Sequence, residues 1–147
     1  MTIIEAVRDY LRQWPKLQNE RVNVDFLPED PVTFSVDVTP VTPVVRRYIT
    51  GLSLRQFSFV LATHAYYGAE LRQQLDNLGL FEDFADWIER QNRKRNFPDL
   101  GEGRDVRSIE VTTSGYVFAE DAEYARYQIQ CRMLYEQEAD YLEKEND

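Results

Sequence analysis

Apolar and polar residues alternate over long stretches of this chain, and the alternation is clearest near its C-terminal end. Tyr127, Ile129, Cys131, Met133 and Tyr135 are separated by Gln128, Gln130, Arg132 and Leu134, with Arg126 ahead of them. Successive side chains of a strand point to opposite faces of a sheet, so this pattern predicts a strand with one apolar row and one mostly polar row. A sheet made of such strands must bury its apolar face under a second layer.

The same period of two predicts further strands upstream. They are expected over residues 22–26, 32–38, 44–49, 54–63, 109–111 and 116–118. The turn-prone link 27–31 predicts that the first two form a hairpin, and Gly51 marks the turn of a second pair. Pro40 and Pro43 cannot donate to a sheet ladder, so residues 39–43 are expected to form an extended arm.

Two segments have the helical period instead. Thr2 and Glu5 have the spacing of a capping box, and Pro15 ends the stripe that follows, which consists of Ile3, Val7, Leu11 and Trp14. A longer helix is predicted from the stripe Leu71, Leu75, Leu78, Phe81, Ala85 and Ile88. Gly79 lies inside it, where glycine costs roughly 1 kcal/mol relative to alanine and marks a position at which the helix can break. Residues 96–105 are expected to form a loop.

The order helix, strands, helix, strands defines the expected fold class. Most links between the strands are too short for parallel crossovers. We therefore expect an α+β fold in which an antiparallel β-sheet is flanked by two main α-helices. A single domain is expected over residues 1–136, followed by an acidic, flexible tail over residues 137–147.

Composition excludes several classes of protein. The 147 residues carry 17 Lys+Arg against 26 Asp+Glu, a net charge of −9, of which −5 lies in residues 136–147. This balance disfavours binding to the nucleic-acid backbone, which needs a surplus of basic residues. A single cysteine cannot form an internal disulfide, and no apolar run approaches the ~20 residues of a membrane-spanning helix. An acid at Glu5 without a basic region argues against a signal peptide.

Catalytic chemistry finds little support in the sequence. His64, the only histidine, is a candidate general base, but no accompanying nucleophile motif is recognisable. Cys131 lies on the apolar row of its strand, where burial would leave the thiol inert. Glu82, Asp86 and Glu89 share a helix face and are expected to be solvated rather than to bind a metal. We therefore predict no enzyme, no cofactor and no metal.

Two groups of basic residues are candidates for contacts with other molecules. Arg90, Arg93, Lys94 and Arg95 gather at the end of the long helix, where cations also complement the helix dipole. They are candidates for facing a channel through which DNA passes, without specific recognition of nucleic acid. Arg46 and Arg47 beside Tyr48 follow the proline arm, and these residue types are enriched at protein interfaces.

Six stretches carry a resemblance to known proteins: residues 39–48, 54–57, 66–68, 84–89, 113–116 and 125–132. They resemble a family of small proteins encoded in the structural gene clusters of tailed phages and prophages, and the resemblance covers roughly residues 1–138. These proteins are commonly labelled phage minor capsid or minor tail proteins. Some carry a chloramphenicol-resistance label, for which this chain has no catalytic constellation. The deduced order of elements is also similar to that of siphophage tail terminator, or tail completion, proteins.

The resemblance implies a non-enzymatic assembly protein of the virion. Tail terminators are small α+β subunits that form a ring, typically a hexamer, which caps the tail tube and joins it to the head. The expected partners are therefore further copies of this chain, the tail tube protein and head–tail connector proteins, and the expected location is the virion, with the bacterial host cytoplasm during assembly. A head-completion or minor capsid protein is the first alternative, and a small ligand-binding domain or enzyme using His64 is the second.

Ring contacts are expected along the proline arm, Asp37 to Tyr48, and along the last strand. A sheet edge presents unpaired backbone groups, and a closed head-to-tail ring would cover such edges. The residues predicted to make the contacts are Asp37, Arg46, Arg47, Tyr48, Arg126 and Arg132.

Overall fold

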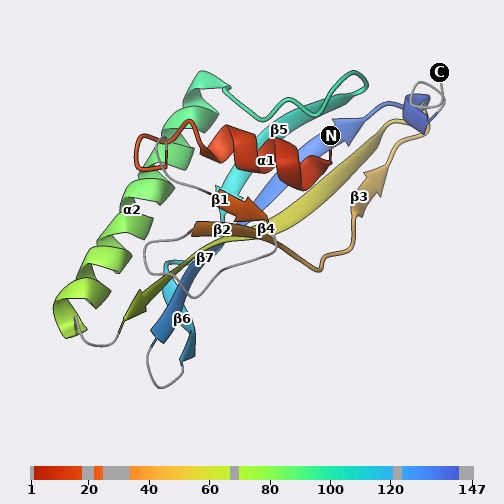
Figure 1. The fold of residues 1–147 in the computed structure, drawn as a ribbon. Helices are drawn as coiled ribbons and strands as arrows, with labels where there is room; N and C mark the ends of the chain where they lie inside the picture. The colour runs from red at the N-terminus through yellow and green to blue at the C-terminus, as the bar shows by residue number, and fades with distance from the viewer. Residues whose placement is uncertain (1, 18–21, 25–33, 67–69, 121–123, 143–147) are drawn as a thin grey trace.

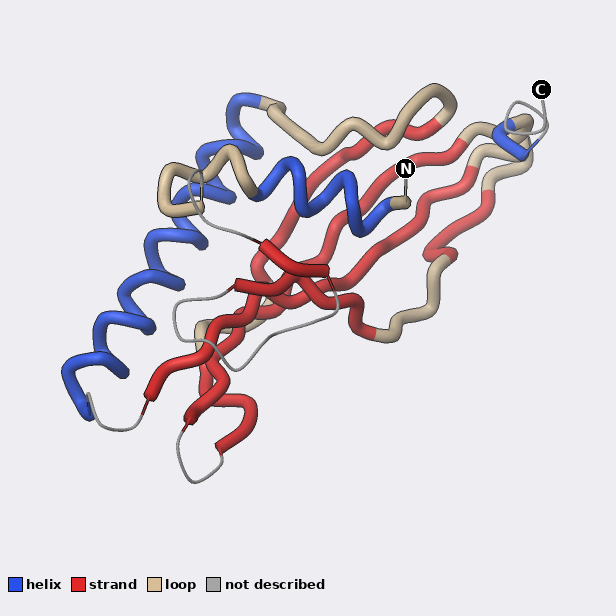
Figure 2. Tube along the Cα trace, in the orientation of Figure 1, coloured by secondary structure: helices blue, strands red, loops and turns tan. Residues whose placement is uncertain are grey.

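The computed structural model describes residues 2–17, 22–24, 34–66, 70–120 and 124–142. These residues form two helices and seven strands that belong to one sheet. Figure 1 shows both helices on the same side of the sheet, with α1 lying across it and α2 running along one flank. The strands form a long, twisted layer that is easiest to follow in the trace of Figure 2. The expected α+β class, an antiparallel sheet with two helices, is confirmed.

Helix α1, Ile3–Leu11, begins as the sequence predicts. The Thr2 hydroxyl accepts a hydrogen bond from the Glu5 backbone N–H at 3.3 Å, so Thr2 is the N-cap. The helix ends at Leu11, earlier than Pro15, because the chain enters turns whose bonds include Trp14 N–H to the Leu11 carbonyl at 3.0 Å. Trp14 is nevertheless buried, since this turn directs its ring into the core.

The sheet is built around two long antiparallel strands, β4 (Ser53–Tyr66) and β7 (Tyr124–Gln137). β2 (Phe34–Thr39) and β3 (Val44–Arg47) share the other edge of β4, one beyond the other. β5 (Arg104–Val111) and β6 (Tyr116–Glu120) likewise share the far edge of β7. The predicted pairing of 44–49 with 54–63 is confirmed, with Gly51 in the turn at a φ of 90°.

One predicted pairing is wrong. β1, Val22–Val24, pairs with β2 in parallel, with Val22 opposite Phe34 and Val24 opposite Val36, so these strands do not form a hairpin. An alternating pattern fixes which face of a strand is apolar, but it is the same in either strand direction. The connecting residues 25–33 lie outside the described part of the chain.

Helix α2, Glu70–Lys94, passes through Gly79 without a break. A Cβ added at Gly79 would meet no atom within 4 Å, so the glycine serves no close approach. The C-terminal end of α2 is a Schellman motif, in which Arg95 N–H bonds to the Asn92 carbonyl and Asn96 N–H to the Gln91 carbonyl. Arg95 therefore takes the left-handed conformation, with a φ of 55°.

The core lies between the helices and the apolar face of the sheet. Trp14 contacts Phe84 edge to face, with ring centroids 5.3 Å apart, and Tyr10 contacts Trp87 at 5.4 Å. Such aromatic pairs each contribute about 0.5–1.5 kcal/mol beyond the area that they bury. The strands supply the facing layer, which includes Val36, Phe59, Leu61, Ile109, Tyr127, Ile129, Cys131 and Met133.

Residues 137–142, which the sequence predicts to belong to the flexible tail, are attached to the fold. Gln137 ends β7, the Glu138 N–H donates to the Gly103 carbonyl at 2.9 Å, and the Tyr141 ring lies 4.1 Å from the Arg104 guanidinium. These contacts attach residues 137–142 to the start of β5. Residues 143–147 are outside the described ranges.

Candidate interaction surface

Exposed apolar side chains concentrate along one edge of the sheet. Seven large hydrophobic residues are exposed among those described, and five of them lie between residues 38 and 49, which we call the β3 edge. They are Val38, Val41, Val45, Tyr48 and Ile49. Ile49, at the turn between β3 and β4, is fully exposed, with a relative accessibility of 107%. Single exposed apolar residues are ordinary, but several within twelve residues of the chain make this edge a candidate interaction surface.

Hydrogen bonds hold the β3 edge in place. The Gln56 side chain donates to the Thr42 carbonyl at 2.7 Å, and the Gln56 N–H donates to the Pro43 carbonyl at 2.9 Å. The predicted arm is thus irregular backbone between β2 and β3 that β4 anchors. Val45 is the extra residue of a β-bulge, because Val44 and Arg46 pair with consecutive residues of β4.

The charged residues of the β3 edge are also exposed. Arg46 and Arg47 follow the bulge, and neither forms an ion pair with another described residue. Tyr48 begins the turn, where its backbone N–H donates to the Leu52 carbonyl and its carbonyl accepts from Gly51. The structure therefore brings together three of the predicted contact residues, Arg46, Arg47 and Tyr48, beside apolar side chains.

The opposite edge of the sheet is protected. The Asn92 side chain of α2 accepts a hydrogen bond from the Ile109 N–H at 3.0 Å and donates to the Ile109 carbonyl at 2.7 Å. The amide thus takes the place of a neighbouring strand in the middle of β5. A covered edge cannot pair with another chain at this position.

The other three predicted contact residues lie on the sheet face that the helices leave uncovered. Arg126 and Asp37 form an ion pair at 2.6 Å across β4, and both are half-buried. Arg132 pairs with Glu110 of β5 at 2.6 Å. Around them the face is polar and partly buried, with Ser35, Ser58 and Gln128 among its members. Asp37, Arg126 and Arg132 thus have partners within the subunit and lie apart from the Arg46–Tyr48 group.

The predicted basic cluster is at the C-terminal end of α2, where Arg90, Arg93, Lys94 and Arg95 are all exposed. Arg90 and Lys94 line a hollow of about 450 Å³ together with Lys16, and Asp83 and Asp86 line the same hollow. Arg93 is on a different side of the helix, in a groove beside β5. The cluster is therefore divided between two surfaces, and its orientation toward a DNA channel stays a prediction.

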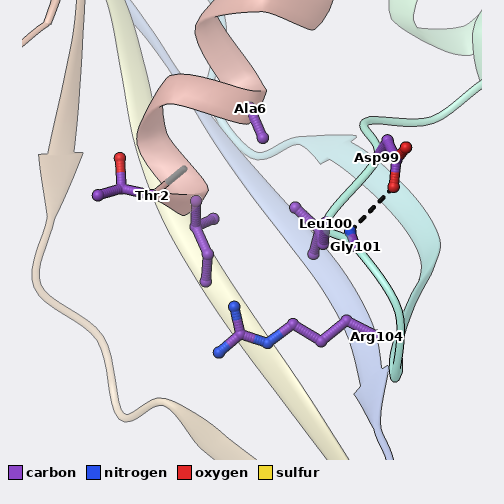
Figure 3. A pocket seen from close by; sticks show the side chains of 7 residues that line it. Thr2, Ala6, Asp99, Leu100, Gly101 and Arg104 are labelled. Carbon is purple, nitrogen blue, oxygen red and sulfur yellow. Dashed lines mark hydrogen bonds between the residues drawn. The ribbon is translucent and has the colours of Figure 1, made fainter. Parts of the chain in front are cut away.

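A smaller hollow of about 260 Å³ lies between the start of α1 and the loop before β5 (Figure 3). Its two charged side chains already have roles inside the molecule. Asp99 accepts the Gly101 N–H at 2.9 Å, and Arg104 donates to Gln137 at 3.0 Å while its guanidinium packs on Tyr141. These contacts shape the loop and the start of β5.

The candidate reactive groups of the sequence are placed as follows. Cys131 is completely buried, and burial raises the pKa of its thiol, as expected for an inert cysteine. His64 lies in β4 opposite Arg126, and its side chain is not among those described. Glu82, Asp86 and Glu89 are exposed on α2. Within the described ranges, no three His, Cys, Asp or Glu side chains come together as a metal site, and no helix has the length and apolar composition to cross a membrane.

Sequence patterns missed two parts of this surface. Val41, Val45 and Ile49 read as ordinary strand or arm residues, although the adjacent pair Val44-Val45 breaks the alternation and is the one available sign of a bulge. Asn92 gave no signal, because nothing in a single sequence shows that a helix side chain bonds to a distant strand.

Comparison with known proteins adds no relative: neither a scan against protein-family models nor a search of the curated proteins finds a match to this chain.

Proposed function

We propose that this chain is a non-enzymatic structural protein of a tailed-phage or prophage particle, and that it acts as the tail terminator. In this role, identical subunits form a ring, a hexamer in the virion, which caps the tail tube and joins it to the head. Its partners are further copies of itself, the tail tube protein and the head–tail connector proteins. Assembly takes place in the bacterial cytoplasm.

The β3 edge is the observation that carries this proposal. The sheet presents exposed apolar side chains at one edge, together with two arginines that form no ion pair with another described residue. At the other edge, Asn92 occupies the backbone groups of Ile109. A molecule whose two edges differ in this way is suited to directional assembly with other subunits. The α+β fold also agrees with the family that the sequence resembles.

Electron microscopy of particles made without this chain tests the proposal. The gene is deleted from the phage or prophage that encodes it and supplied again from a plasmid as the control. We expect overlong tails, or tails not joined to heads, and restoration of joined tails by the plasmid. Defective or leaking heads with normal tails would overturn the terminator role in favour of a head-completion or minor capsid protein. Normal particles would overturn both.

An enzyme or ligand-binding domain using His64 is the remaining alternative. It requires convergent polar groups around the imidazole ring. Substitution of His64 by Gln in the plasmid copy separates the two classes, because the terminator proposal expects this variant to restore joined tails.

A further inference from the structure

A groove of about 670 Å³ runs between α2 and the outer edge of β5. Its apolar lining consists of the buried Ile88 and Ile109 and the half-buried Ala85 and Val111, and Asn92 and Ser108 add neutral polar groups. Inside the groove, the Asn92 side chain is bonded to the backbone N–H and carbonyl of Ile109. A second chain that enters there must therefore dock through its side chains rather than by adding a strand at this position.

The rim of the groove is mainly acidic. Asp86, Glu89 and Glu110 line it and are exposed, with Arg93 as the basic residue of the lining. Glu110 is neutralised by Arg132 at 2.6 Å. Asp86 and Glu89 form no ion pair with any residue in the described ranges. The groove thus combines apolar side chains with two carboxylates that have no ion-pair partner among the described residues, one helical turn before Arg90 and Arg93.

The turn between β3 and β4 has the complementary properties. Ile49 projects fully into solvent, Tyr48 is exposed beside it, and Arg46 and Arg47, which form no ion pair with another described residue, supply two positive charges. A protruding apolar side chain flanked by cations matches an apolar lining flanked by carboxylates. The same chain therefore carries both halves of a contact.

The two halves are far apart in the fold. The groove is on the β5 side of the sheet, whereas β3 lies beyond β4 on the other side. Figure 1 shows α2 and β3 on opposite flanks of the molecule. The groove of one molecule is thus positioned to meet the turn of another molecule, not its own.

We propose that the α2–β5 groove of one copy receives the β3–β4 turn of a second copy. Ile49 and Tyr48 pack on the apolar lining, and Arg46 and Arg47 pair with Asp86 and Glu89. Because the contact joins two different surfaces, one copy of a bound pair keeps a free turn and the other keeps a free groove. Repetition of the contact therefore gives a closed ring or a filament. This contact rests on the proposed assembly function and specifies its partner surface.

Paired charge reversals test the contact by sedimentation velocity. Arg46→Glu/Arg47→Glu disables the turn, and Asp86→Lys/Glu89→Lys disables the groove. We expect wild-type chain to associate with rising concentration and each variant alone to associate at least about tenfold more weakly. An equal mixture of the two variants should regain association beyond the dimer, because the native groove takes the native turn and the reversed groove takes the reversed turn. A chain with all four reversals should regain association.

Matched controls separate the contact from a general effect of charge. Glu82→Lys/Asp83→Lys changes the same helix by the same charge but lies outside the groove, and Lys16→Glu/Arg90→Glu matches the turn variant. Both should associate as wild type does. Far-UV circular dichroism verifies that every variant is folded, as expected for exposed positions.

Three results would overturn the contact: a wild-type chain that stays monomeric up to about 1 mM, turn and groove variants that associate like wild type, or a mixture that stays monomeric. The microscopy of deleted particles decides the terminator role separately. If deletion leaves particles normal but the chain associates head to tail in solution, the contact is supported and the terminator role is wrong. If deletion gives overlong or unjoined tails but the chain does not associate in this way, the terminator role is supported and the contact is wrong.

Discussion

At the scale of single residues, burial controls the chemistry of the core. Cys131 is fully buried in β7, and Tyr10 is buried against Trp87 while its hydroxyl donates to the Asn96 carbonyl at 2.9 Å. Burial raises the pKa of both groups, because the charged form loses its hydration. The apolar row predicted the position of Cys131, whereas the buried polar residues Ser58 and Gln128 were not foreseeable, since their partners come from distant strands.

The raised pKa of Cys131 predicts that the protein loses stability in mild alkali. The unfolded thiol loses its proton above about pH 8.5, whereas the folded thiol keeps it, so the stabilisation is complete below that pH and is lost as pH rises. The free energy of unfolding should fall increasingly steeply between pH 8.5 and 10, with a slope that approaches about 1.4 kcal/mol for each pH unit. Urea titrations at several pH values measure this slope.

Cys131→Ala is the matching control for this prediction. The variant starts from a lower stability because it leaves a small cavity, and its free energy of unfolding should fall much less with pH, because only the raised pKa of Tyr10 still contributes as pH approaches 10. A buried neutral thiol would be contradicted if the free energy of unfolding fell equally steeply with pH in both proteins. Rapid alkylation of Cys131 in the folded chain would also contradict it.

At the scale of elements, the residue that directly follows α2, Arg95, has a backbone conformation that favours glycine over other residues. Arg95 is in the left-handed region, with a φ of 55°, where a side chain costs roughly 1 kcal/mol relative to glycine. Arg95→Gly should therefore raise the free energy of unfolding by about 0.5–1 kcal/mol. Arg93→Gly, also exposed but within the helix, should lower it by about 1 kcal/mol. Thermal unfolding of the two variants measures the difference, and stabilisation or loss in both would contradict the Schellman geometry.

Local patterns predicted the elements whose signals are local. The capping residue Thr2, the stripe of α1 and the alternation of β7 each depend on neighbours in the sequence, and all three appear in the structure. The parallel direction of β1 and the length of β5, which begins at Arg104 inside the predicted loop, depend on pairing with distant strands. The exposure of Ile49 likewise depends on the position of the β3–β4 turn in the fold and not on a local pattern.

At the scale of the whole molecule, the two flanks of the sheet are unlike. One flank has the exposed side chains of the β3 edge, where Arg46 and Arg47 form no ion pair with another described residue. The other is covered by α2, whose Asn92 satisfies the backbone of Ile109. An exposed strand edge promotes indiscriminate pairing between chains. Because the backbone of Ile109 is already bonded, another chain can contact this position only through side chains, which have a defined orientation.

Asn92→Leu should remove this restriction. The substitution leaves the N–H and carbonyl of Ile109 without their partner, which costs about 2–3 kcal/mol of the free energy of unfolding, and it opens the middle of β5 to strands of other molecules. We expect light scattering to show aggregation of this variant on warming, even when Arg46→Glu/Arg47→Glu is also present, because the two edges act independently. Asn92→Asp keeps the oxygen that accepts from Ile109 and should aggregate less. If Asn92→Leu scattered no more light than wild type on warming, Asn92 would not be what protects this edge. The directionality of assembly would then have to come from the β3 edge alone.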